Sequence, residues 1–137
     1  MFAVKGGDQL MSYSGSGVPM VTELPLDSRL AAGSQVPEIG VLFGGHVGRV
    51  YRWDGDRLVD FESAGSWTKS QRMMVPFAGG FLLGSEGGQV QHYAPSRGYC
   101  DVEAPTGQSV RVGRSLGARA VVSPNNAGAG TLFVLEE

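Results

Sequence analysis

The sequence has a single cysteine, Cys100, so the chain cannot form an internal disulfide. This excludes the small secreted folds that several disulfides hold together. The segment "GYCDV" around Cys100 has the character of a strand and supplies no second thiol or histidine at metal-ligand spacing. We therefore expect Cys100 to be a small buried apolar residue.

An excess of charge of one sign and a long apolar run are also missing. Thirteen acidic residues stand against eleven basic ones, which gives a net charge of -2 over 137 residues. A chain with this balance lacks the electrostatic footprint of a nucleic-acid-binding protein. No apolar run reaches 18 residues, and the N-terminus lacks the charged and apolar regions of a signal peptide. We expect a soluble protein that neither carries an export signal of this kind nor binds membranes.

Glycine, by contrast, is abundant, and it recurs within a repeat. The 22 glycines predict many tight turns, and therefore many short strands. The stretch "VLFGGHVGRVYRWDGD" from residue 41 aligns with "FLLGSEGGQVQHYAPS" about forty positions further on, and weaker copies lie around Leu10 and after Val121. We interpret the chain as a single domain, 1–137, built of repeats at about 1–40, 41–80, 81–120 and a partial 121–137.

Each complete repeat is predicted to form four short antiparallel strands. Residues 71–103 contain four such pieces, separated by glycine, proline or serine. The first repeat begins at the second strand and the last ends after the third, which predicts three, four, four and three strands, fourteen in all. Less than about a tenth of the chain is expected to be helical, since 26–35 is the one candidate helix and it contains Gly33. The predicted core includes Leu42, Val50, Leu82 and Val90.

The predicted fold class is all-β, with about four forty-residue antiparallel units in a β-propeller-like arrangement. The alternative is a β-trefoil, which uses twelve strands in three repeats and leaves the fourth copy over. The backbone edge of the closing strand, Thr131–Glu137, needs a partner. The chain's own segment Phe2–Gly7 would close a ring, whereas another chain would complete an arc. The incomplete terminal units favour the second alternative, and hence self-association.

No catalytic, cofactor-binding or metal-binding residues are predicted. His46 and His92 occupy different positions of their repeats and lack the spacing of zinc ligands. The stretch "DGDRLVD", Asp54 to Asp60, lacks the terminal glutamate of a calcium-binding loop and is typical of a hairpin turn. Ser16 lies in a glycine-rich turn without the helix that follows a hydrolase nucleophile. The chain is therefore predicted not to be an enzyme.

Four aromatic residues form the candidate binding surface. Tyr13, Trp53 and Tyr93 occupy one equivalent position in three repeats, and Trp67 stands apart from them in "AGSWTKS". If the repeated aromatics face inward, they pack one unit against the next, which we favour. If they face outward, they can stack on sugars or grip a partner, which would suit a carbohydrate-binding lectin with repeated sites.

The segments "GRVYRWDGDRLVDF" and "MMVPFAGGFLLGSEGGQVQHYA" resemble β-propeller blades in which a strand of the type Val-Tyr-Arg-Tyr-Asp-Gly ends a hairpin. The resemblance covers 40–103 well and the terminal repeats loosely, and "HYAPSRG" departs from it where an Asp-Gly turn would stand. It implies a non-enzymatic structural or adaptor module of a larger assembly, as in bacterial and bacteriophage structural proteins, so a virion is one expected location. The expected partner is a protein or a further copy of the chain, with carbohydrate as the alternative.

Overall fold

Short strands joined by tight turns make up the regular structure of the computed structural model, and no helix occurs among the residues it describes. The described residues are 2–5, 9–13, 15, 17–24, 29–62, 67, 69–103, 108–124 and 133–136. One turn shows why glycine is frequent. Between β8 (Gln71–Phe77) and β9 (Gly80–Ser85), Ala78 and Gly79 both have positive φ, 47° and 72°, as a two-residue hairpin turn that matches the twist of its strands requires.

The strands form four antiparallel sheets, each a meander in which sequence neighbours pair. Sheet 1 contains β1 (Phe2–Lys5), β2 (Gln9–Ser12) and β3 (Met20–Glu23). Sheet 2 contains β4 (Ala32–Val36), β5 (Gly40–Gly44), β6 (Val50–Trp53) and β7 (Leu58–Asp60). Sheet 3 contains β8, β9, β10 (Val90–Ala94) and β11 (Gly98–Val102). Sheet 4 contains β12 (Val110–Leu116), β13 (Arg119–Pro124) and β14 (Phe133–Glu136). The predicted strand numbers of three, four, four and three are confirmed.

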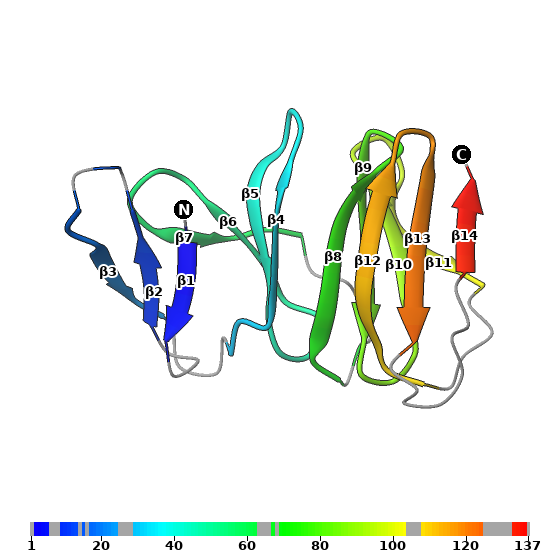
Figure 1. Cartoon of the computed structure of the whole chain (residues 1–137), viewed down its shortest axis with the longest axis horizontal. Coiled ribbons are helices and arrows are strands. Elements are labelled where there is room, and N and C mark those ends of the chain that lie inside the picture. The colour runs from blue at the N-terminus through cyan, green and yellow to red at the C-terminus, as the bar shows by residue number, and fades with distance from the viewer. Residues whose placement is uncertain are drawn as a thin grey trace.

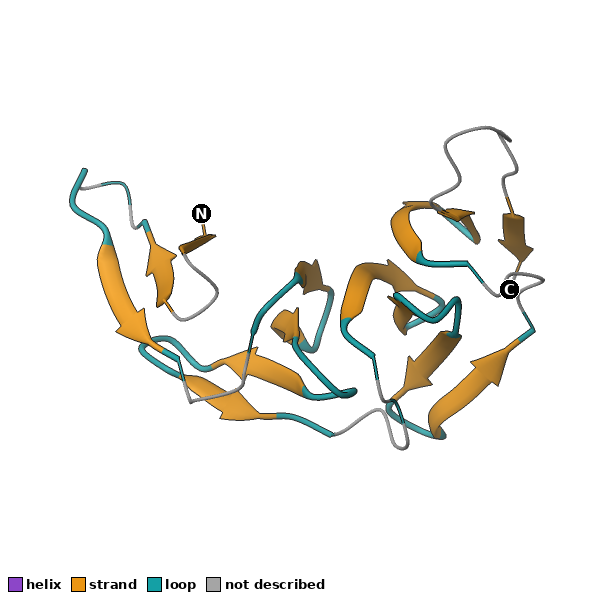
Figure 2. Ribbon diagram, turned by 90° about the horizontal axis from the view of Figure 1, so that it is seen from below, coloured by secondary structure: helices purple, strands orange, loops and turns teal. Residues whose placement is uncertain are grey.

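The four sheets follow one another in chain order, with the N-terminus in the first and the C-terminus in the last (Figure 1). Figure 2 shows them along an arc that stays open on one side. The first strands of three successive sheets, β4, β8 and β12, lie side by side. Among the described strands, β14 pairs with β13 alone and β1 with β2 alone. The described strands therefore form an open arc and not a closed ring.

Three apolar clusters hold the sheets together face to face. The cluster between sheets 1 and 2 contains Leu10, that between sheets 2 and 3 contains Leu42 and Val50, and that between sheets 3 and 4 contains Leu82 and Val90. The predicted core residues Leu42, Val50, Leu82 and Val90 are each no more than 2% exposed, so this prediction is confirmed. Sheets 2 and 3 bury both faces, because each is stacked between two neighbours.

Glycine at the end of the second strand lets successive sheets approach closely. A Cβ added at Gly84 in β9 would lie 2.8 Å from Cγ1 of Val110 in β12. One added at Gly44 in β5 would overlap the side chain of Gln71 in β8. A glycine that faces the first strand of the next sheet therefore recurs at the two contacts that sheet 3 makes, and the two glycines are forty positions apart in the sequence.

The structure also tests the expectations for Cys100 and for the candidate helix 26–35. Cys100 is exposed, not buried, and it lies on β11, an edge strand of sheet 3. In the candidate helix 26–35, β4 begins at Ala32, so this end is a strand and not a helix. Ser16 and the positions 25–28, 131, 132 and 137 lie outside the described residues.

Candidate functional site

The structure does not bring the four predicted aromatic residues together. Trp53 is half-buried and meets the ring of Phe2 edge-on, with 5.4 Å between the ring centroids. Tyr93 and Trp67 are both buried in the cluster between sheets 2 and 3. Tyr13 follows β2 and is exposed.

The neighbouring sheet decides which of these aromatics are covered. Trp53 packs against the cluster shared with sheet 1, and Tyr93 packs in the cluster shared with sheet 2. Tyr13 belongs to sheet 1, and no described sheet precedes it. Trp67 and Tyr93 are therefore core residues rather than surface residues, and the repeated aromatic platform of the lectin alternative is not formed.

Two tyrosines stand at the centre of a cluster of rings between sheets 2 and 3. Tyr93 stacks on Phe81 with 4.9 Å between centroids, and the ring of Tyr99 lies 4.9 Å from that of Tyr93. The Tyr99 hydroxyl donates to the carbonyl oxygen of Glu62 at 2.7 Å. Burial raises the pKa of Tyr99 well above its ordinary value, and the charges of Tyr93 and Glu62 add to this shift. The pKa of Tyr93 is also raised, first by burial and then by Glu62.

We expect the stability of the protein to fall as the pH rises above about 10. A phenol whose pKa is raised by folding holds its proton more tightly in the folded chain. Its contribution to the free energy of unfolding is therefore complete below the unfolded pKa of about 10 and is lost as the pH rises above that value. Melting temperatures measured between about pH 8 and pH 12 should show this fall. Tyr99→Phe should make it shallower, while the lost hydrogen bond costs about 1 kcal/mol at neutral pH. The same slope in both proteins would contradict the assignment.

The polar residues considered for metal chemistry make local contacts. The Nδ1 atom of His46 lies 2.9 Å from the Ser70 hydroxyl, and Nε2 of His92 lies 3.2 Å from the carbonyl oxygen of Phe77. The turn after β6 is a closed hairpin, as predicted, in which the amide of Asp54 donates to the carbonyl of Arg57 at 3.1 Å. Within the described ranges, no group of three His, Cys, Asp or Glu residues lies close enough to hold a metal ion.

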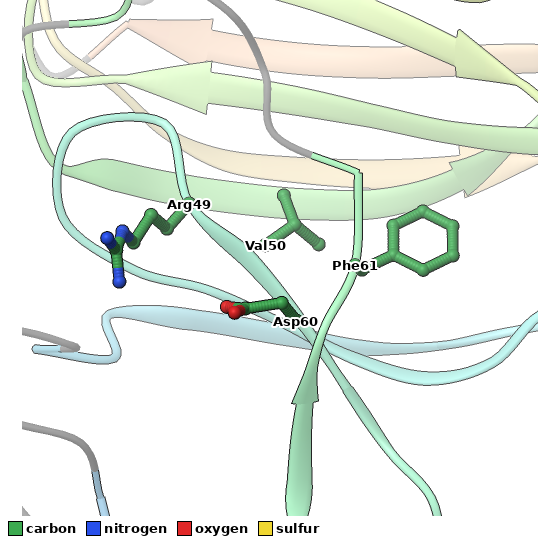
Figure 3. A pocket seen from close by; sticks show the side chains of 4 residues that line it. All are labelled: Arg49, Val50, Asp60 and Phe61. Carbon is green, nitrogen blue, oxygen red and sulfur yellow. The ribbon is translucent and has the colours of Figure 1, made fainter.

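Open hollows occur at the same place in the two middle sheets. In sheet 2, a hollow of about 280 Å³ is lined by Arg49, Val50, Asp60 and Phe61, with Arg49 and Phe61 at opposite sides (Figure 3). In sheet 3, a hollow of about 610 Å³ lies beside Val90 and its strand partner Val102, and it includes Asp101 and Glu103. Each hollow lies where the third strand begins beside the end of the fourth. The repeat of the strand plan thus creates a repeated depression with at least one carboxylate.

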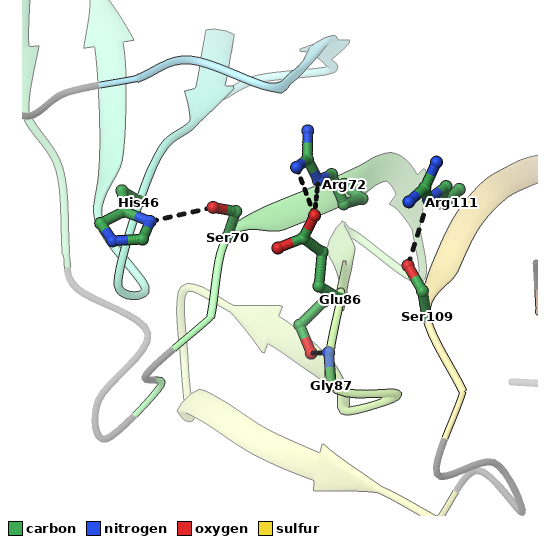
Figure 4. A network of polar contacts seen from close by, with 8 residues as sticks. His46, Ser70, Arg72, Glu86, Gly87, Ser109 and Arg111 are labelled. Carbon is green, nitrogen blue, oxygen red and sulfur yellow. Dashed lines mark hydrogen bonds and ion pairs between the residues drawn. The ribbon is translucent and has the colours of Figure 1, made fainter.

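A groove of about 240 Å³ runs over the first strands of sheets 2, 3 and 4 and carries two arginines. Arg72 on β8 donates through Nε to Glu86 at 2.8 Å, and its Nη2 atom also contacts this carboxylate (Figure 4). Arg111 on β12 donates to the Ser109 hydroxyl at 3.3 Å. No salt bridge to Arg111 is found within the described residues. The carboxylate therefore offsets the charge of Arg72, whereas Arg111 has a neutral partner.

Large exposed apolar side chains gather at the two ends of the arc. They are Tyr13, Val18, Met20 and Val21 in or beside sheet 1, and Leu116 and Val134 in sheet 4. Val21 is 50% exposed, and Leu116 and Val134 are 55% exposed each. Elsewhere in the described part of the chain only Val47, in the turn between β5 and β6, belongs to this group, at 43%. Of these positions only Tyr13 was predicted from the sequence as part of a binding surface; the others were missed, although their apolar character in the end repeats was a usable signal.

No protein-family model matches the chain, and no curated protein matches it. A solved structure of BBS1N in complex with ARL6DN is similar, with 14% sequence identity and a TM-score of 0.59. The match covers 96% of this chain and 45% of the BBS1N chain, so this chain spans less than half of that chain's length. None of the described residues forms a helix of the length and apolarity needed to cross a membrane. At this identity the likeness is one of fold alone: the chain shares with BBS1N an arrangement of β-sheets.

Proposed function

We propose that the chain is a protein-binding module, a non-enzymatic structural or adaptor part of a larger assembly. The observation that carries this proposal is the concentration of exposed apolar side chains on the two end sheets. Exposed apolar patches of this kind mark interaction sites, because leaving them in water is unfavourable. The similarity to BBS1N, which was solved together with the protein ARL6DN, supports the same function.

In this proposal the four sheets are blades of an incomplete β-propeller. Support comes from the face-to-face stacking of successive antiparallel meanders and from the blade resemblance of residues 40–103. A β-trefoil would place three repeats around one barrel, whereas the described strands form four separate sheets. The resemblance to blades of bacteriophage structural proteins makes a virion one setting for such a module, with further copies of the chain among its partners.

Site-specific photo-cross-linking tests the proposed surface. A photoreactive amino acid at Val134 or Val21 should give protein adducts in an extract of the organism that makes the chain, because both side chains lie on the end sheets. The same group at Val47 is the matched control, since this residue has similar exposure and lies in a turn between two strands of a middle sheet. Equal adduct yields at all three positions would contradict the assignment of binding to the ends.

A further inference from the structure

Sheets 2 and 3 are covered on both faces, whereas sheets 1 and 4 each have one face that no described strand covers. Tyr51 is buried where sheet 2 faces sheet 1, and Leu82 is buried where sheet 3 faces sheet 4. Both positions have counterparts in the end sheets. No described sheet covers them there.

The uncovered face of sheet 4 keeps apolar residues at two covered positions of sheet 3, whereas the exposed Arg114 takes the place of the buried Val75. The strand β13 pairs with β12 and β14 as β9 pairs with β8 and β10, so that Val121 corresponds to Leu82. Val121 lies directly opposite Val134 in β14 and on the other face from Val122, which packs on sheet 3. Leu116 lies on the same face as Val134, and both are more than half exposed.

The uncovered face of sheet 1 has the same character. Met11 in β2 lies opposite Val21 in β3, and both point away from Leu10, which packs on sheet 2. In the matching strand of sheet 2, the position of Met11 is taken by the buried Tyr51. Tyr13 extends this apolar face beyond the end of β2.

We propose that a second copy of the chain covers both faces head to tail, so that sheet 4 of each copy packs on sheet 1 of the other. The contact repeats the face-to-face stacking that joins successive sheets within one chain. Two copies give eight sheets, within the range of about four to eight blades in which propellers close. The arc leaves one side open for a second arc to complete (its open side is seen in Figure 2). One chain corresponds to 45% of the similar BBS1N chain. This inference rests on the proposed function, because it names the partner that covers the end sheets.

Sedimentation equilibrium of the purified chain tests the inference. We expect about twice the chain mass of 14.4 kDa. The two contacts between sheet 4 of one copy and sheet 1 of the other are the seams of the ring. Val134→Asp and Val21→Arg each place a charge within both seams. Each variant should raise the dissociation constant of the dimer at least about tenfold, since the charge loses water on association. Both residues are at least half exposed, so the variants should keep the melting temperature of the wild-type monomer. Val47→Asn, outside both faces, is the control and should leave the mass unchanged.

Mixing the two defective variants tests the head-to-tail arrangement itself. In a mixed ring, one seam joins the introduced carboxylate to the introduced guanidinium, and the other seam is wild type. An equimolar mixture should therefore regain the dimeric mass although neither variant does so alone. A contact of one face with itself would instead leave one of the two variants dimeric.

The inference is overturned by a monomeric wild-type chain, by a mass that grows without limit as concentration rises, or by a dimer that either variant leaves intact. A mixture that stays monomeric also overturns it. The proposed function is judged separately. It stands if the purified chain is monomeric but residues 21 and 134 cross-link to other proteins in the extract, and it fails if they do not.

Discussion

Val50→Asp should lower the free energy of unfolding by about 3 to 5 kcal/mol, enough to unfold a small domain of ordinary stability. Val50 begins β6 and is buried between sheets 2 and 3, in one cluster with Leu42 and Phe81. A carboxylate at this position either loses its hydration without gaining a partner or takes up a proton, and both are costly. Urea unfolding at neutral pH measures the loss.

Arg52→Asp is the matched control, because Arg52 lies two residues further along the same strand and is exposed. This substitution should change the free energy of unfolding by less than about 0.5 kcal/mol. An equal effect of both substitutions would mean that β6 does not present Val50 to the core.

Strand number and core were predictable because their signals are local. The alternation of apolar and polar residues around Val50 and Val90, with glycine-rich turns on either side, specifies hairpins whatever their surroundings. The same alternation predicts burial of these residues on one face, whereas burial of the other face, as at Tyr51, depends on the neighbouring sheet. The exact repeat boundaries stay a prediction, since the sheets give strand ends and not the limits of a repeat.

The coverage of individual side chains was not predictable in this way, because it depends on which sheet stands next. Tyr13 and Tyr93 share a position in the repeat, yet one is exposed and the other is buried. Cys100 has strand-like neighbours, but its strand lies at a sheet edge, which no local pattern encodes. The apolar end faces could have been found by comparing the apolar residues of the first and last repeats with those of the two middle repeats.

Buried polar groups are a further feature that the alternation of apolar and polar residues does not predict. Gln71 begins β8 and is fully buried, and neither polar atom of its side chain has a hydrogen-bond partner within the described part of the chain. The corresponding position in sheet 4 is Val110, which is apolar and packs on Gly84. The same contact between a glycine of one sheet and the first strand of the next thus accepts either glutamine or valine. A polar residue at a strand start therefore does not by itself indicate a surface position.

Gly80→Ala should lower the free energy of unfolding by about 3 kcal/mol or more. A Cβ at Gly80, the first residue of β9, would overlap the backbone carbonyl oxygen of Tyr93 in β10 and lie 3.1 Å from the Cα of Ala94. Backbone atoms at this place cannot yield easily, because Tyr93 pairs with Phe81 across the two strands and stacks on its ring. The substitution therefore forces apart the centre of sheet 3, on which both neighbouring sheets pack.

Gly79→Ala separates this clash from the general effect of adding a methyl group to the turn. Gly79 has φ of +72° and nothing within 4 Å of an added Cβ, so only the left-handed backbone conformation opposes the change, at about 1 kcal/mol. Urea unfolding of both variants should thus place Gly80→Ala at least about 2 kcal/mol below Gly79→Ala. Equal losses would show that β9 and β10 can separate at this point without cost, and that the close approach at Gly80 does not hold sheet 3 together.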